Sequence, residues 1–369
     1  NTYIGDEAGL HFTSSYNVAI GHSALRGQSG SSTGTNNMAI GAMAGFELTT
    51  GTDNVFLGRC SGRKATSAKG NFFVGRDNAN DTAFTGNYNN GLGRRAGMCL
   101  TTGNYNNLFG QSAGRNLLTA CHNNFLGLNA GCNNETGSYN NFFGANAGRY
   151  FTSSNNVAIG ASALRGQSGS STGANNIAIG AMAGCSNTTG RYNNFFGCHA
   201  GRGNTEGSHN TFMGFSAGRY NVGGNGNFFA GQDAGCCNTG DFNTIIGQFA
   251  GKEQQEACRN VFIGINAGRN VSTGSNNNFI GGYAGQNVDT GAHNNFFGVF
   301  AGCQSTSGLD NNYFGRYAGC ANTTGQRNHF LGSNAGRYFI SSDNVAIGNS
   351  ALRGSSGNST GGQNIAIGQ

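Results

Sequence analysis

Short apolar runs recur along the whole chain, each framed by Asn before it and Gly after it. Two neighbouring copies are Asn193–Gly197 (NNFFG) and Asn210–Gly214 (NTFMG). With the Gly of each copy as position 0, the phrase occurs 22 times between Gly5 and Gly368, mostly every 17 residues and in three places after 16 and then 20. Position −4 is Asn in all 22 copies, and position −1 is always apolar. The chain is therefore a tandem repeat with a period of about 17 residues.

Each apolar run predicts one short β-strand per repeat. The runs are rich in Phe, Ile and Val and are bounded by Gly and Asn, which is typical of strands of three to five residues. Two Gly per repeat disfavour packed helices, because each costs a helix about 1 kcal/mol. One strand per period predicts an all-β fold: a parallel β-solenoid, or β-roll, of 22 coils with about 17 residues per coil. Equivalent residues of successive coils would then lie about 4.8 Å apart.

The invariant positions predict a structural ladder. We expect the Asn at −4, represented by Asn140, Asn193 and Asn210, to bond through its side-chain amide to the coils on either side. The Gly at position 0 suits a corner that needs positive φ or a close backbone approach. Gly144, Gly197 and Gly214 occupy that position, and Ala at +3 suits a tight interior corner.

Positions −2 and −1 must point to opposite faces of the strand, as at Phe195 and Phe196. Both positions are apolar almost throughout, and −2 is Phe or Tyr in thirteen copies and Ala in six. If one position fills the interior, the other face exposes a stripe of thirteen aromatic residues, far more than the apolar patches of about 300–600 Å² found on monomers. We therefore expect this face to be covered by another chain, which makes the protein a homo-oligomer.

Composition supports one uninterrupted repeat array over residues 1–369. The sequence begins without Met and ends within the repeat motif, so we expect it to be a segment of a longer chain. The sequence has 67 Gly, no Pro and only 10% charged residues, but its 27 Phe and 12 Tyr are unlike a disordered chain. No apolar run approaches the roughly 20 residues of a membrane helix. A membrane-spanning segment is thus not expected in 1–369.

Several repeats resemble a known family. Asn155–Ala163 (NNVAIGASA), Asn175–Ala183 (NNIAIGAMA) and Asn344–Ala351 (NVAIGNSA) are similar to the head repeats of trimeric autotransporter adhesins, and to Asn/Gly-rich phrases in bacterial and phage fibres. The resemblance implies a left-handed parallel β-roll, a homotrimer or filament, and a location outside the cell or on a cell or virion surface. The family's repeat is shorter and lacks the Phe-Phe pair.

No pattern in the sequence favours an enzyme. The seven His are scattered, three of them at turn position −5, and the 15 Asp and Glu form no repeated set. We therefore predict no catalytic residues, no cofactor and no metal site. A net charge of +6 is too small to favour nucleic acid as a partner.

Position +5 is the most distinctive polar column, with ten Arg and one Lys. One interpretation is a linear site for anionic polysaccharide. The alternative is that the Arg side chains pack between coils and that their charge keeps the protein soluble. The candidate anion or glycan residues are Arg115, Arg149, Arg202, Arg219, Arg269 and Arg337.

Three further features of the sequence bear on its chemistry. Cys303 and Cys320 share position +5 in adjacent coils, close enough to form a disulfide. Asn-x-Ser/Thr triplets in what looks like an exposed turn are candidate glycosylation sites, at Asn134, Asn187, Asn322 and Asn358. Thr is frequent at −8, and a flat Thr ladder would suit ice binding. The favoured function is a structural fibre or stalk subunit, and the alternative is a glycan-binding or ice-binding solenoid.

Overall fold

The computed structural model describes residues 1–30, 32–169, 171–355 and 359–369. The chain divides into two compact units, Asn1–Thr189 and Gly190–Gln369, and the repeat runs through both. In the described residues the only regular elements are strands, so the protein is all-β. The predicted parallel β-solenoid with about 17 residues per turn is confirmed.

Each strand has three residues, at positions −3 to −1. The described part of unit 1 holds β1 (Thr2–Ile4), β2 (Val18–Ile20), β3 (Met38–Ile40), β4 (Val55–Leu57), β5 (Phe72–Val74), β6 (Asn90–Leu92), β7 (Asn107–Phe109), β8 (Asn124–Leu126), β9 (Asn141–Phe143), β10 (Val157–Ile159) and β11 (Ile177–Ile179). The described part of unit 2 holds β12 (Asn194–Phe196), β13 (Thr211–Met213), β14 (Phe228–Ala230), β15 (Thr244–Ile246), β16 (Val261–Ile263), β17 (Asn278–Ile280), β18 (Asn295–Phe297), β19 (Asn312–Phe314), β20 (His329–Leu331), β21 (Val345–Ile347) and β22 (Ile365–Ile367).

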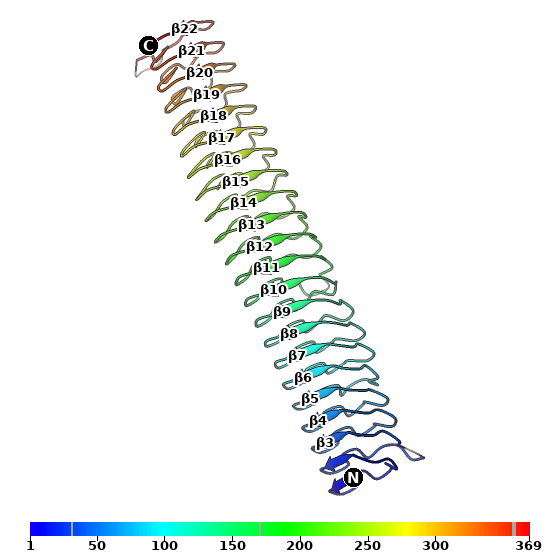
Figure 1. Cartoon of the computed structure of the whole chain (residues 1–369). Helices are drawn as coiled ribbons and strands as arrows, with labels where there is room; N and C mark the ends of the chain where they lie inside the picture. Colours follow the sequence, from blue (N-terminus) through cyan, green and yellow to red (C-terminus); the bar gives the residue numbers. More distant parts are fainter. Residues whose placement is uncertain (31, 170, 356–358) are drawn as a thin grey trace. The chain divides into compact units, whose positions relative to one another are not determined.

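Within each unit, successive strands pair in parallel and without a register shift (Figure 1). In β7 and β8, for example, Asn107 faces Asn124 and Phe109 faces Leu126. The turns continue the pairing, because their N–H groups also bond to the neighbouring coils. In one coil, Gly214 donates to Phe196 O at 2.8 Å and Gly218 donates to Ala234 O at 3.0 Å. Equivalent residues therefore stack over one another all the way round the coil.

The buried Asn ladder forms as predicted. Asn193 Oδ1 accepts the backbone N–H of Asn210 at 3.0 Å, and Asn210 Nδ2 donates to the Gly224 carbonyl at 2.7 Å. Asn140 makes the same contacts in unit 1, accepting from Asn156 N at 2.8 Å. These side chains are fully buried and cannot bond to water, so the ladder supplies the hydrogen-bond partners that their amide groups need.

The Gly at position 0 is required by both its φ and its surroundings. Gly197 has φ of 131°, and a Cβ there would lie 2.6 Å from the Gly214 carbonyl oxygen. Gly144 and Gly214 have φ of 141° and 129° with equally close contacts. A side chain at this corner would therefore push the coils apart.

The interior contains positions −4, −2, +3 and +7. At −2, the rings of Phe262, Phe279, Phe296, Tyr313 and Phe330 stack at centroid separations of 4.6–5.1 Å. Rings at such separations attract each other beyond the area they bury. The core of unit 2 thus contains a row of stacked aromatic rings beside the hydrogen-bonded amides. In unit 1 the rings occur in pairs, as with Phe125 and Phe142, between coils with smaller residues at −2.

Candidate functional site

The face that the strands turn outward is the candidate functional site, and its orientation corrects one expectation. Phe195 is fully buried inside the coil, whereas Phe196 points outward and is only half-buried. The thirteen aromatic residues at −2 therefore lie inside and not on an exposed stripe. The reason is alternation: −2 lies on the same side as −4, and the Asn at −4 is held inside by its ladder.

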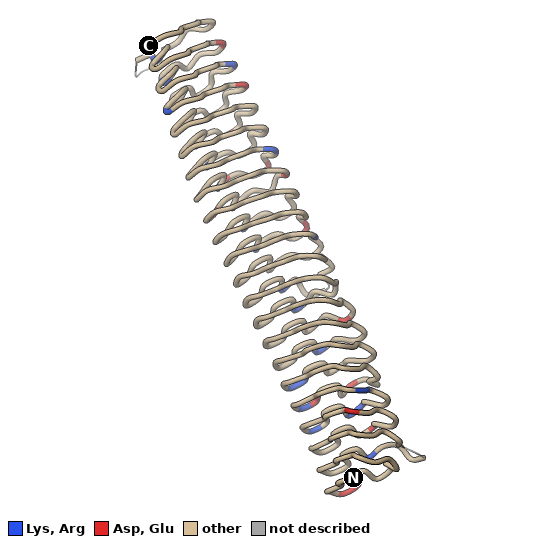
Figure 2. Tube along the Cα trace, in the orientation of Figure 1, with Lys and Arg blue, Asp and Glu red and all other residues tan. Residues whose placement is uncertain are grey.

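Positions −3 and −1 form what we call the outward face. Position −1 is apolar in every described strand of both units, and in unit 1 Leu92, Phe109, Leu126 and Phe143 are 36–50% exposed. None of the residues of β1–β22 is Asp, Glu, Lys or Arg, and the strands are accordingly tan in Figure 2. The outward face therefore carries no Asp, Glu, Lys or Arg, and its −1 column is apolar.

Position −3 carries a second amide ladder, beside the apolar column. In unit 1, Asn90, Asn107, Asn124 and Asn141 are joined by Nδ2–H···Oδ1 bonds of 2.8, 2.7 and 2.8 Å. In unit 2, Asn278 donates to Asn295 and Asn295 to Asn312, at 2.7 and 2.8 Å. These side chains are half-buried, and each amide has a second N–H that the ladder does not use.

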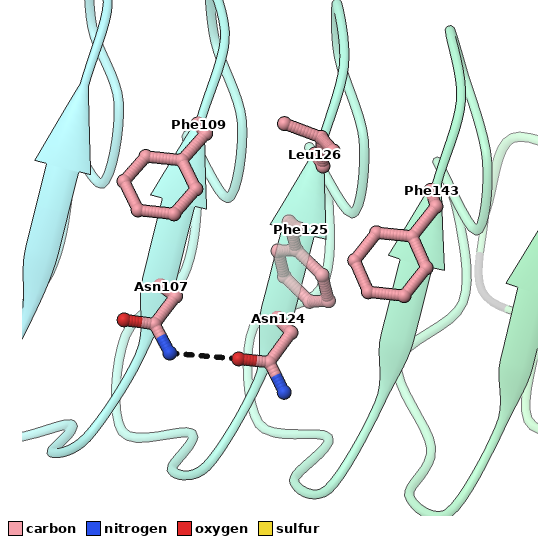
Figure 3. Close-up of a pocket in the computed structure, with 6 residues that line it drawn as sticks. All are labelled: Asn107, Phe109, Asn124, Phe125, Leu126 and Phe143. Carbon is pink, nitrogen blue, oxygen red and sulfur yellow. Dashed lines mark hydrogen bonds between the residues drawn. The ribbon is translucent and has the colours of Figure 1, made fainter.

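The apolar column has a hollow where Leu126 stands between two larger residues. Figure 3 shows Phe109 and Phe143 on either side of Leu126, with the Asn107–Asn124 hydrogen bond along one edge. The hollow has a volume of about 250 Å³ and an almost wholly apolar lining: Asn107, Phe109, Asn124, Phe125, Leu126 and Phe143. It has the size of one large side chain and is too shallow to enclose a substrate.

An aromatic stack at −5 was missed in the sequence. The rings of Tyr88, Tyr105, His122 and Tyr139 lie 5.0–5.3 Å apart and nearly parallel. The signal was visible, because the triplet Tyr/His-Asn-Asn recurs every 17 residues at 88, 105, 122 and 139. The same triplet marks the outward Asn ladder, which sequence reasoning also missed.

The six candidate Arg residues of the +5 column are half-buried, and several have partners of their own. Arg149, Arg269 and Arg337 donate to the Asn three residues earlier, at 3.2–3.5 Å. Arg337 also lies over the Tyr317 ring at 4.4 Å, and Arg219 over Tyr220 at 5.0 Å. Arg115 and Arg202 are half-buried in the same column. These contacts match packing between coils, the alternative interpretation of the +5 column.

Cys303 and Cys320 lie in adjacent coils and are buried, but both are free thiols in the structure. Cys303 Sγ lies 3.9 Å from the Cys320 carbonyl oxygen. The hydrogen bond with the Cys320 thiol, together with burial, raises the pKa of Cys303, which disfavours its thiolate. A disulfide stays a prediction, and mass mapping of the unreduced protein would check it.

The glycosylation candidates correct a second expectation. Asn134, Asn187 and Asn322 occupy position +7 and are fully buried, so the turn that looked exposed in the sequence places them in the core. Their amide nitrogens are not accessible in the folded chain. Asn358 lies outside the described residues.

The remaining chemistry is sparse. The Thr hydroxyls at −9, next to the −8 column, donate to carbonyl groups of the following coil, as Thr101 does to Leu118 O at 2.9 Å and Thr306 to Thr323 O at 3.0 Å. In the described ranges, no three His, Cys, Asp or Glu side chains gather closely enough to bind a metal. That same part of the chain contains no helix able to cross a bilayer.

Stacked short strands, two amide ladders and one uncharged apolar face define a tandem-repeat β-solenoid protein. Comparison with protein-family models finds no match, and comparison with curated proteins finds no relative. Function therefore has to be argued from the residues.

Proposed function

We propose that this protein is a structural fibre or stalk subunit that acts outside the cell or on a cell or virion surface, as a homo-oligomer. The observation that carries the proposal is bonding between coils at nearly every turn of each unit. The resemblance of Asn155–Ala163 to adhesin head repeats supports the extracellular location.

Coil-to-coil bonding suits a mechanical role because it involves main chain and side chains together. Between the coils of Gly197 and Gly214, backbone bonds run at Asn194, Gly201, Gly203 and Gly214, at 2.7–2.9 Å. The rings of Phe195 and Phe212 lie 5.5 Å apart across the same junction, with their planes tilted by 30°. A protease or a pulling force must break this whole set before it frees one strand.

The alternative, glycan binding along the Arg column, has less support. The guanidinium groups of Arg149, Arg269 and Arg337 already bond to Asn of their own turns. The ice-binding alternative requires a second outward Thr column, and the adjacent hydroxyls instead donate to carbonyls.

Limited proteolysis and a glycan array together test the proposal. The folded chain should resist protease under conditions that digest an unfolded control. A variant in which four Arg residues are replaced together by Gln should keep the same protease resistance and the same signal on the glycan array as the wild type. The four residues are Arg115, Arg149, Arg202 and Arg219. Glycan binding that disappears in the Gln variant while the fold persists would favour the alternative. Rapid digestion of the wild-type chain would contradict the structural role.

A further inference from the structure

We infer that the outward face binds the same face of a second copy of this chain, so that two sheets pack against each other. The inference rests on the proposed structural role and names the partner of its outward face. Three properties of the outward face support it: the absence of charge, the available area, and the period of its side-chain rows.

The first property is charge. The chain has 36 Asp, Glu, Lys and Arg residues, yet positions −3 and −1 of β1–β22 contain none of them. A face that remained in water would tolerate charge, as the neighbouring column at +1 does with Arg59, Arg76 and Arg94. Exclusion of charge from one face is typical of a surface that loses water on association.

The second property is area. In unit 1, eight side chains at −1 are 36–58% exposed: Ile4, Ile40, Leu92, Phe109, Leu126, Phe143, Ile159 and Ile179. At about 200 Å² for a large apolar side chain, these eight together offer roughly 700 Å². The Asn and β-branched residues at −3 extend this to the roughly 800 Å² per partner of a stable interface. One unit alone therefore offers enough surface.

The third property is the period. The outward rings of Phe297 and Phe314 stack at 4.8 Å, which sets the spacing of side-chain rows along the face. Only a surface with the same spacing can match these rows over many coils, because any mismatch accumulates from row to row. A second copy has this spacing by construction, and an unrelated globular partner does not.

Packing of like faces also suits the Asn ladder. The second amide N–H of Asn107 and Asn124 points away from the ladder and can meet an amide oxygen of the facing sheet. Dry contacts between paired sheets commonly combine apolar rows with Asn ladders of this kind. A lipid surface fits less well, since these amides would enter hydrocarbon without partners.

Charge placed on the face tests the inference. In the full chain, Phe109, Leu126 and Phe143 are replaced by Lys, and in a matched control Gln111, Leu128 and Ala145 of the same three coils are replaced by Lys. All six positions are exposed, but the control positions lie at +1. Mass is measured by sedimentation velocity over a dilution series, and fold by thermal melting and proteolysis.

The wild-type chain and the control should form dimers, and the outward-face variant should dissociate at least tenfold more readily with unchanged melting. A wild-type monomer, a trimer, or equal weakening by the control would overturn the inference. Flotation of wild-type monomers with neutral liposomes would overturn it in favour of lipid. In each of these cases an intact protease resistance would leave the structural fibre or stalk role standing, so the two proposals fail separately. A wild-type monomer would in addition remove the homo-oligomer from the proposed function.

Discussion

Position −2 and the residue six places later share one space inside the coil. Where −2 is Phe, +4 is Gly in every coil except that of Phe73, which has Ala79. A Cβ on Gly201 would lie 2.4 Å from the Phe195 ring. Where −2 is Ala158, +4 is Leu164, which is fully buried with φ of 43°. Large and small residues are thus exchanged between these two coils. The coil of Ala39 and Gly45 has a small residue at both positions and is filled by its neighbours, since a Cβ on Gly45 would lie 2.8 Å from Leu25 and 3.1 Å from Phe56.

Exchanging the pair at one coil tests this volume balance. Phe195→Ala alone should cost about 3–5 kcal/mol through the cavity it leaves. Gly201→Leu alone should cost about 1–3 kcal/mol through overpacking. Because Leu fills the space of the ring, the double variant should be more stable than the sum predicts by about 1–3 kcal/mol, measured by urea unfolding. Strictly additive losses would contradict the shared space.

The two amide ladders should differ in their contribution to stability. Asn210→Ala leaves the Asn227 N–H and the Gly224 carbonyl buried without partners, so we expect a loss of about 2–4 kcal/mol. Asn295→Ala, in the half-buried outward ladder, should cost about 1 kcal/mol or less, because water can replace its bonds. Equal losses in chemical denaturation would show that burial does not decide the cost.

At the scale of the element, each strand contacts only the strands next to it in its unit. A solenoid of this kind has a stability close to a sum of coil and neighbour terms. Three residues of strand are too few to be stable alone, so each coil depends on the two beside it.

Removing one coil tests this dependence. Deletion of Cys198–Gly214, which is one 17-residue period, joins Gly197 to Phe215 in the original phase. We expect the variant to keep its far-UV circular dichroism and to melt within about 2–4 °C of the wild type. Deletion of Cys198–Thr205 removes fewer residues but shifts the following repeat positions out of alignment with the preceding coil. This variant should melt at a far lower temperature. A reversed order of stability would contradict the neighbour-only picture.

Sequence alone predicted the strands, the interior Asn at −4 and the Gly corners, because their chemistry repeats in every copy. It did not predict which of Phe195 and Phe196 lies inside, since alternation gives opposite faces without saying which one is buried. The Gly at +4, which leaves room for the −2 ring, could have decided it. Asn134 was misplaced because Asn beside Thr and Gly is typical of a turn, and only its stacking over other +7 residues puts it in the core.

At the scale of the whole molecule, both units have the same plan: stacked aromatic rings, an interior amide ladder and an uncharged outward face. Each has its own buried, stacked Phe rings, with Phe125 and Phe142 in unit 1 and Phe262 and Phe279 in unit 2. Nothing in this plan requires the other unit.

Each unit should therefore fold alone. Residues 1–189 and 190–369, produced separately, are expected to show strand-rich circular dichroism and a cooperative melt, because every coil except the last at each end keeps both neighbours. The cut will expose fresh strand edges, so some aggregation is expected at high concentration. A fragment that is unfolded when dilute would contradict this independence.

The exchange of Phe and Gly for Ala and Leu also has a genetic consequence. Since the two kinds of coil pair in register where they meet, as β9 does with β10, a crossover between misaligned copies of the gene segment would join a coil of one kind to a coil of the other without a register shift. Thr13–Gly45 and Thr152–Gly184, which differ at four positions, look like the product of such an event. The length of the array can thus change by whole turns while every intermediate still folds, so selection can adjust reach without redesigning the core.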